Sequence, residues 1–232
     1  MKLEQMKRQR LEKVMEIYHN RYNDILERIK PSIKSNGFAE HNQTVNFVSA
    51  YELIAGYKKE VVSSWYEFQI QNGKRSDNRI DGIIVNHSTK EIYLIEAKRI
   101  SRNKVRKKKA ELIDDYCRIM QLDKVNRFTE ALKGENVSDY SIYGILLFDI
   151  WTENKAEKEL YHKWNELCNS KNPTREEFIK VLDADKIILK PEYISDEIFP
   201  MIKEVQCLRG KKYSYYLCAF IWDTECKKSG NR

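Results

Sequence analysis

The sequence predicts a single mixed α/β domain, in which helices flank a β-sheet and one long helix precedes the rest of the chain. Helical periodicity alternates along the sequence with short runs of β-branched and aromatic residues. Three such runs follow one another with turn residues between them, as in an antiparallel meander. A fourth run, at 142–151, is apolar almost throughout, which is typical of a central strand covered on both faces.

Residues 1–30 predict one long helix, because apolar side chains recur every three to five residues among charged ones. Pro31 ends this pattern. We expect the helix to pack against the same chain, and a seam between the subunits of a homodimer is the alternative. The chain therefore divides into an N-terminal helical extension at 1–31, a main domain at 32–226 and a C-terminal tail at 227–232.

A second helix is predicted at 40–55, where Gly56 ends it in the manner of a C-terminal cap. The three runs of the meander follow it as Val61 to Ile70, Arg79 to Asn86, and Glu91 to Ile100. The rest of the chain predicts a helix at 110–133, the apolar strand at 142–151, two helices between 153 and 182, and strands at 186–189 and 213–222. The order of helix, meander, helix and strand describes one domain.

The positive charge of the chain is concentrated in one segment. The 232 residues include 42 Lys and Arg against 35 Asp and Glu, a formal charge of +7. Eight of the basic residues lie between Lys98 and Lys109, which contains no acidic residue, and the chain without them would carry −1. A segment of this kind is either a solvated loop or a contact for a polyanion.

Other features of the sequence exclude several classes of protein. No stretch approaches the roughly 18 apolar residues of a membrane-spanning helix. The first residues are charged throughout and contain no apolar core of a secretory signal, so we expect a cytoplasmic protein. The five cysteines include no C-x-x-C pair, which predicts reduced thiols and neither a zinc site nor a disulfide framework.

The second hairpin of the meander brings two carboxylates together. If His87 to Lys90 form its loop, paired residues have numbers that add to 177, and Asp81 faces Glu96. Directly opposed residues of an antiparallel pair have Cβ atoms about 5 Å apart. Side chains alternate along a strand, so Lys98 shares a face with Glu96.

Two carboxylates held this close repel one another unless a cation lies between them. Mg²⁺ is the natural occupant, because it takes oxygen ligands, and Mn²⁺ could replace it. Carboxylates, a divalent ion and a lysine can together hydrolyse a phosphodiester. The alternative is a pair of exposed charges on an edge strand, but the surrounding isoleucines favour a buried sheet.

These residues resemble the PD-(D/E)XK phosphodiesterase superfamily. Ile80-Asp81, fourteen residues and then Glu96-Ala97-Lys98 match its motif, with Ile80 where the family name has Pro. The resemblance covers residues 38–150 and implies a restriction-endonuclease-like core. It also implies Asp81 and Glu96 as metal ligands, the backbone carbonyl of Ala97 as a further ligand, and Lys98 as the catalytic lysine.

Such folds often add a glutamate from the helix before the sheet, and Glu40 and Glu52 are the candidates. If the helix runs back along the following strand, its start returns to Asp81, so we favour Glu40 as a further catalytic residue. A seven-residue loop in the first hairpin would pair residues whose numbers add to 148. This register places Glu67 opposite Asp81 as another possible contributor, with Gln69 on the same face.

The sequence therefore predicts a Mg²⁺-dependent DNA endonuclease, of the restriction type or a related defence or mobile-element nuclease. The basic segment begins at the catalytic lysine, so its side chains are expected to contact phosphates of the DNA backbone. The residues chosen for these contacts are Arg99, Arg102, Lys104, Arg106 and Lys107. Two alternatives stay open: a nucleic-acid-binding or regulatory protein with a vestigial nuclease site, and an RNA nuclease.

Overall fold

The structure is a computed structural model, in which the chain is described at residues 2–29, 40–69, 79–101, 114, 119, 136–153, 158–170, 176–177, 180, 197–206 and 212–223. Its helices are α1 (Lys2–Arg28), α2 (Glu40–Tyr57), the short 3-10 helix η3 (Val137–Asp139) and α5 (Lys158–Asn169). Its strands are β1 (Val62–Gln69), β2 (Arg79–Asn86), β3 (Glu91–Ser101), β4 (Ser141–Glu153), β5 (Glu197–Gln206) and β6 (Lys212–Asp223).

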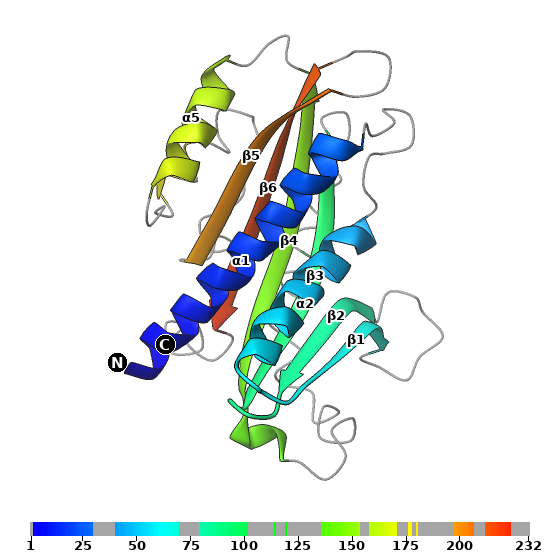
Figure 1. Ribbon diagram of the computed structural model, residues 1–232, viewed down its shortest axis with the longest axis vertical. Helices are drawn as coiled ribbons and strands as arrows, with labels where there is room; N and C mark the ends of the chain where they lie inside the picture. The colour runs from blue at the N-terminus through cyan, green and yellow to red at the C-terminus, as the bar shows by residue number, and fades with distance from the viewer. Residues whose placement is uncertain are drawn as a thin grey trace.

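The strands form one sheet in the order β1-β2-β3-β4-β6-β5. β3 and β4 are parallel, and the other neighbouring strands are antiparallel, which confirms the expected mixed sheet (Figure 1). Both predicted hairpin registers are also confirmed. Asn86 pairs with Glu91 across the second hairpin, and Val62 pairs with Asn86 across the first.

The apolar run predicted as a central strand is β4. It lies between β3 and β6, and every residue from 142 to 150 is buried. Helices cover one face of the sheet, where α1 and α2 run alongside each other (Figure 1). A strand with neighbours on both edges and side chains packed on both faces is buried throughout, and this explains its composition.

α1 packs against the core of its own chain, as expected. Tyr18 meets Phe47 of α2 edge-on with ring centroids 5.7 Å apart, and Tyr22 stacks on Tyr215 of β6 at 5.9 Å. One hydrophobic cluster joins residues of α1, α2 and the sheet. The helical extension proposed at 1–31 therefore shares its core with the domain that follows it.

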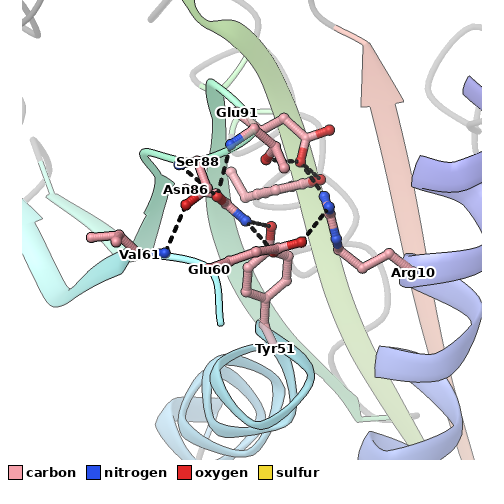
Figure 2. A network of polar contacts seen from close by, with 9 residues as sticks. Arg10, Tyr51, Glu60, Val61, Asn86, Ser88 and Glu91 are labelled. Atoms are coloured by element: carbon pink, nitrogen blue, oxygen red, sulfur yellow. Dashed lines mark hydrogen bonds and ion pairs between the residues drawn. The ribbon is translucent and has the colours of Figure 1, made fainter. Parts of the chain in front are cut away.

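A buried polar network connects α1 to the beginning of β3 (Figure 2). Arg10 donates from Nη1 to Glu91 Oε2 at 2.5 Å and from Nη2 to Glu60 Oε1 at 2.9 Å. Asn86 donates from Nδ2 to Glu60 Oε2 at 2.8 Å and to the Tyr51 hydroxyl at 3.0 Å. Buried charges of this kind are tolerated only when each has partners, so the network fixes how α1 lies on the sheet.

β5 was missed from the sequence. Pro200 lies in the middle of this strand, and a proline inside a run argues against a central strand. β5 is an edge strand that pairs with β6 alone among the described strands, so a residue without an N–H can be accommodated there.

Several predicted elements fall on parts of the chain that are not described. The predicted strand at 186–189 lies outside the described residues, as does nearly all of the predicted helix at 110–133. Of that helix, Asp114 and Ile119 are described, and both are helical. α5 is one of the two helices expected between 153 and 182.

No helix in the described ranges is long and apolar enough to cross a membrane. Cys168 and Cys218, the two cysteines that the structure describes, are both free thiols.

Candidate active site

The candidate site lies where β2 and β3 separate. The two strands are paired as far as Gly82 and Ile95, and one further step in the same register sets Asp81 opposite Glu96. β3 then continues to Ser101 and pairs with β4 alone among the described strands. Beyond Glu96, the edge of β3 that faces β2 therefore has no described strand beside it, and other groups can bind there.

Two carboxylates bind the backbone of this open edge. The N–H of Ala97 donates to Asp81 Oδ2 at 2.7 Å, and the N–H of Arg99 donates to Glu40 Oε1 at 2.9 Å. These carboxylates occupy the positions that carbonyl oxygens of a neighbouring strand would take. In addition, Gln43 of α2 donates from Nε2 to the Lys98 carbonyl at 3.4 Å.

The predicted acidic residues and the lysine are close enough to influence one another. Burial raises the pKa of Asp81, while the Ala97 N–H and the Lys98 ammonium lower it. Glu40 raises the pKa of Asp81 by charge repulsion, and a side-chain hydrogen bond with Glu96 lowers it. Glu96 itself is only 2% exposed. The structure thus brings Glu40, Asp81, Glu96 and Lys98 into one site.

A glycine allows α2 to approach this site. A Cβ atom on Gly82 would lie 2.7 Å from Thr44 Cγ2, closer than such atoms approach in folded proteins. Thr44 is fully buried on the second turn of α2, four residues after Glu40, the first residue of the helix. Because Gly82 has no side chain, the start of α2 can pack close to β2, and Glu40 then reaches the end of β3.

The other acidic candidates lie elsewhere. Glu52 is near the far end of α2 and accepts a hydrogen bond from Ser64 Oγ at 2.5 Å. Glu67 lies between Tyr66 and Phe68, which pair with β2 in the predicted register. Its own backbone has a positive φ of 51°, and its carboxylate binds Arg79 Nη1 at 3.2 Å. Its side chain is 62% exposed, so Glu67 faces solvent and is not part of the site. The Gln69 side chain lies outside the described part of the chain.

The structure gives Arg99 a different environment from the phosphate-binding surface expected for it. Its guanidinium binds the carboxylate of Asp149 on β4, with Nη2 at 3.1 Å and Nε at 3.3 Å. Asp149 is fully buried, whereas the Arg99 side chain is 11% exposed. Burial raises the pKa of Asp149 to about 6, although the Arg99 charge opposes this shift. The other four predicted phosphate contacts lie outside the described residues.

Asp149 was missed from the sequence. It is the single acidic residue within the apolar run at 142–151, which was a signal that it needed a buried partner. Identifying that partner required the parallel register of β3 and β4, in which Arg99 lies directly beside Asp149.

The chemistry of the site suits a hard divalent cation. Asp81 and Glu96 place two carboxylates close together, and carboxylates held this close favour a cation between them. Within the described residues no group of three or more His, Cys, Asp or Glu side chains could hold a metal. Mg²⁺ does not need such a cage, because it is commonly held by one or two carboxylates and several waters.

Comparisons with models of protein families, with curated proteins and with solved structures find no match to this chain.

Proposed function

We propose that this protein is a Mg²⁺-dependent endonuclease that hydrolyses phosphodiester bonds in DNA. The observation that carries the proposal is the convergence of Glu40, Asp81, Glu96 and Lys98 where β2 and β3 separate. The described order of α2, the β1–β3 meander and β4 is compatible with a restriction-endonuclease-like core. We propose that fold as well, and a restriction, defence or mobile-element role with it.

In this proposal Asp81, Glu96 and the Ala97 carbonyl would hold Mg²⁺. When bound, the metal supplies a water of lowered pKa and neutralises charge that develops on the phosphate. Mn²⁺ has the same preference for oxygen ligands and would substitute for it.

The remaining groups would act on the substrate and the water. The Lys98 ammonium, next to the Asp81 carboxylate, would orient the attacking water and stabilise negative charge on the phosphate oxygens. Glu40 would add negative charge to the side of the site that faces α2. The basic residues that follow Arg99, which are Arg102, Lys104, Arg106 and Lys107, would neutralise phosphates of the bound strand.

The proposal is tested by incubating supercoiled plasmid, single-stranded DNA and RNA with the protein in Mg²⁺, Mn²⁺ or EDTA. The wild type is compared with Asp81→Ala and Lys98→Ala, with Glu52→Ala as a matched control at the other end of α2. We expect metal-dependent cleavage of DNA that both site variants abolish and the control retains. Metal-dependent cleavage that survives both site substitutions would remove the assignment, and preference for RNA would identify an RNA nuclease.

One observation favours a second candidate, a nucleic-acid-binding or regulatory protein with a vestigial site. The Asp81 and Glu40 carboxylates already bind backbone N–H groups, which gives them a structural role without chemistry. That candidate predicts salt-dependent binding of DNA with no cleavage in any metal.

A further inference from the structure

A buried ion pair lies directly behind the candidate site. Arg99 and Asp149 are side by side on the parallel strands β3 and β4. Two guanidinium nitrogens of Arg99 reach the Asp149 carboxylate, and Trp151 Nε1 donates to Asp149 Oδ2 at 3.1 Å. Asp149 has no exposed surface, so these donors are what compensates its charge.

The same arginine is connected to the site through its backbone. Its N–H donates to Glu40 Oε1 at 2.9 Å, and the residue before it is Lys98. β3 is not paired with β2 at this point, and within the described residues the side chains of Asp81, Glu40 and Gln43 contact its backbone there. The conformation of the strand at Lys98 and the location of Glu40 therefore both depend on how Arg99 is held.

Stability alone does not explain this pair. Replacing a buried ion pair by apolar residues of similar volume is often neutral or stabilising, whereas removing one partner is strongly destabilising. An apolar pair of similar volume is therefore expected to stabilise this position about as well. A planar guanidinium bound by a carboxylate through two nitrogens has a defined direction, which an apolar side chain lacks.

We infer that Asp149 is a positioning residue, which through Arg99 fixes the end of β3 so that Lys98 and Glu40 keep their places in the site. Asp149 touches neither the substrate nor a metal in this scheme. The expected effect on cleavage rests on the proposed function. The effect on the position of β3 does not, because it can be measured without cleavage. It also gives Arg99 a role inside the protein in place of the phosphate contact predicted from the sequence.

The fold contains a matched control. Arg10 and Glu91 form a second buried ion pair on the same sheet, and both side chains are 8% exposed. Glu91 begins β3, whereas Arg99 lies near the end of the same strand. Breaking the Arg10–Glu91 pair disturbs the polar network of Figure 2, which lies at the beginning of β3, whereas Lys98 lies near the end of that strand.

The first experiment compares Asp149→Asn with Glu91→Gln by amide hydrogen exchange. We expect Asp149→Asn to speed exchange of the Arg99 and Ile100 amides at least tenfold relative to core amides of β4, such as Leu146. Glu91→Gln should leave that ratio unchanged. Equal effects of the two variants on the end of β3 would overturn the inference, whether or not the protein cleaves DNA.

The second experiment separates positioning from folding with apolar replacement of both partners. The double variant R99M/D149L should regain the melting temperature that Asp149→Asn loses. Its kcat should nevertheless stay about 10- to 100-fold below the wild type, with KM changed less than about threefold. The control R10M/E91L should cleave at the wild-type rate once folded.

Recovery of both stability and kcat in R99M/D149L would overturn the inference. Arg99→Lys, which keeps the charge but presents one donor group, should retain more activity than Arg99→Met. Calorimetric titration with Mg²⁺ alone should show about tenfold weaker binding by R99M/D149L than by R10M/E91L. If the wild type cleaves nothing, the proposed function fails, and the exchange experiment still decides whether Asp149 fixes β3.

Discussion

The backbone N–H of Arg99 donates to the Glu40 carboxylate at 2.9 Å, which joins the end of β3 to the first residue of α2. The N–H of Ala97 is bound by Asp81 in the same way at 2.7 Å. Both carboxylates therefore support the open edge of a strand as well as the proposed chemistry. A substitution of either carboxylate can separate its structural role from its role in the chemistry only if it removes the charge and keeps the hydrogen bond, or the reverse.

Glu40→Gln removes the charge but leaves an oxygen that can accept from the Arg99 N–H. We expect its free energy of unfolding to stay within about 1 kcal/mol of the wild type. Cleavage should fall about 10- to 100-fold, because the site loses a negative charge near the cation. Denaturant unfolding and plasmid cleavage measure the two effects, with Glu52→Gln as the control. Wild-type cleavage by Glu40→Gln would show that this carboxylate has only a structural role.

Gly82→Ala should displace α2, because its Cβ would lie 2.7 Å from Thr44 Cγ2. We expect a loss of about 1 to 3 kcal/mol in the free energy of unfolding and a loss of cleavage. Thr44→Ser removes the Cγ2 methyl group. The double variant G82A/T44S should therefore recover most of the stability and most of the cleavage that Gly82→Ala loses. Denaturant unfolding of the two single variants and the double variant tests this coupling. Additive losses would contradict the close approach of α2 to β2.

His19 should make the protein sensitive to acid. Burial lowers its pKa from 6.5 to about 4, so the folded state resists a proton that the unfolded state accepts. Its contribution to stability is present above pH 6.5 and is lost as the pH falls toward 4. Asp149 acts in the opposite direction over part of this range, since its pKa is raised to about 6 in the folded state.

Comparison with His19→Gln isolates the histidine, because Asp149 is present in both proteins. The stability of the wild type relative to His19→Gln should fall by about 1 to 3 kcal/mol between pH 7.5 and pH 4. Urea unfolding at several pH values gives this difference. A difference that does not change with pH would contradict the lowered pKa of His19.

The basic segment should dominate the salt dependence of DNA binding. Replacing Arg102, Lys104, Arg106 and Lys107 by alanine should reduce the slope of log affinity against log salt by about 3 to 4. Replacing Arg99 by methionine should change this slope little, because its guanidinium binds Asp149. Binding titrations in EDTA at four salt concentrations measure the slope without cleavage. An unchanged slope in the fourfold variant would place the phosphate contacts elsewhere.

The sequence by itself determined the local part of this architecture. Loop length sets the register of a hairpin, so the pairings of β1 with β2 and of β2 with β3 could be counted from the chain. That register was enough to predict Asp81 opposite Glu96, with Lys98 two residues further on. The direction of α2 relative to the meander also follows from topology, which predicts Glu40, and not Glu52, at the end of β3 that carries the site.

Only the tertiary structure decided the partners that are distant in the chain. The Arg99–Asp149 pair joins residues fifty positions apart across a parallel strand pair, whose register no hairpin loop sets. β5 was missed because Pro200 is compatible with a strand only at the edge of a sheet, and the edge is known only when the strand order is known. A charge pattern suggested that Arg99 faces DNA, but packing against β4 turned its side chain inward.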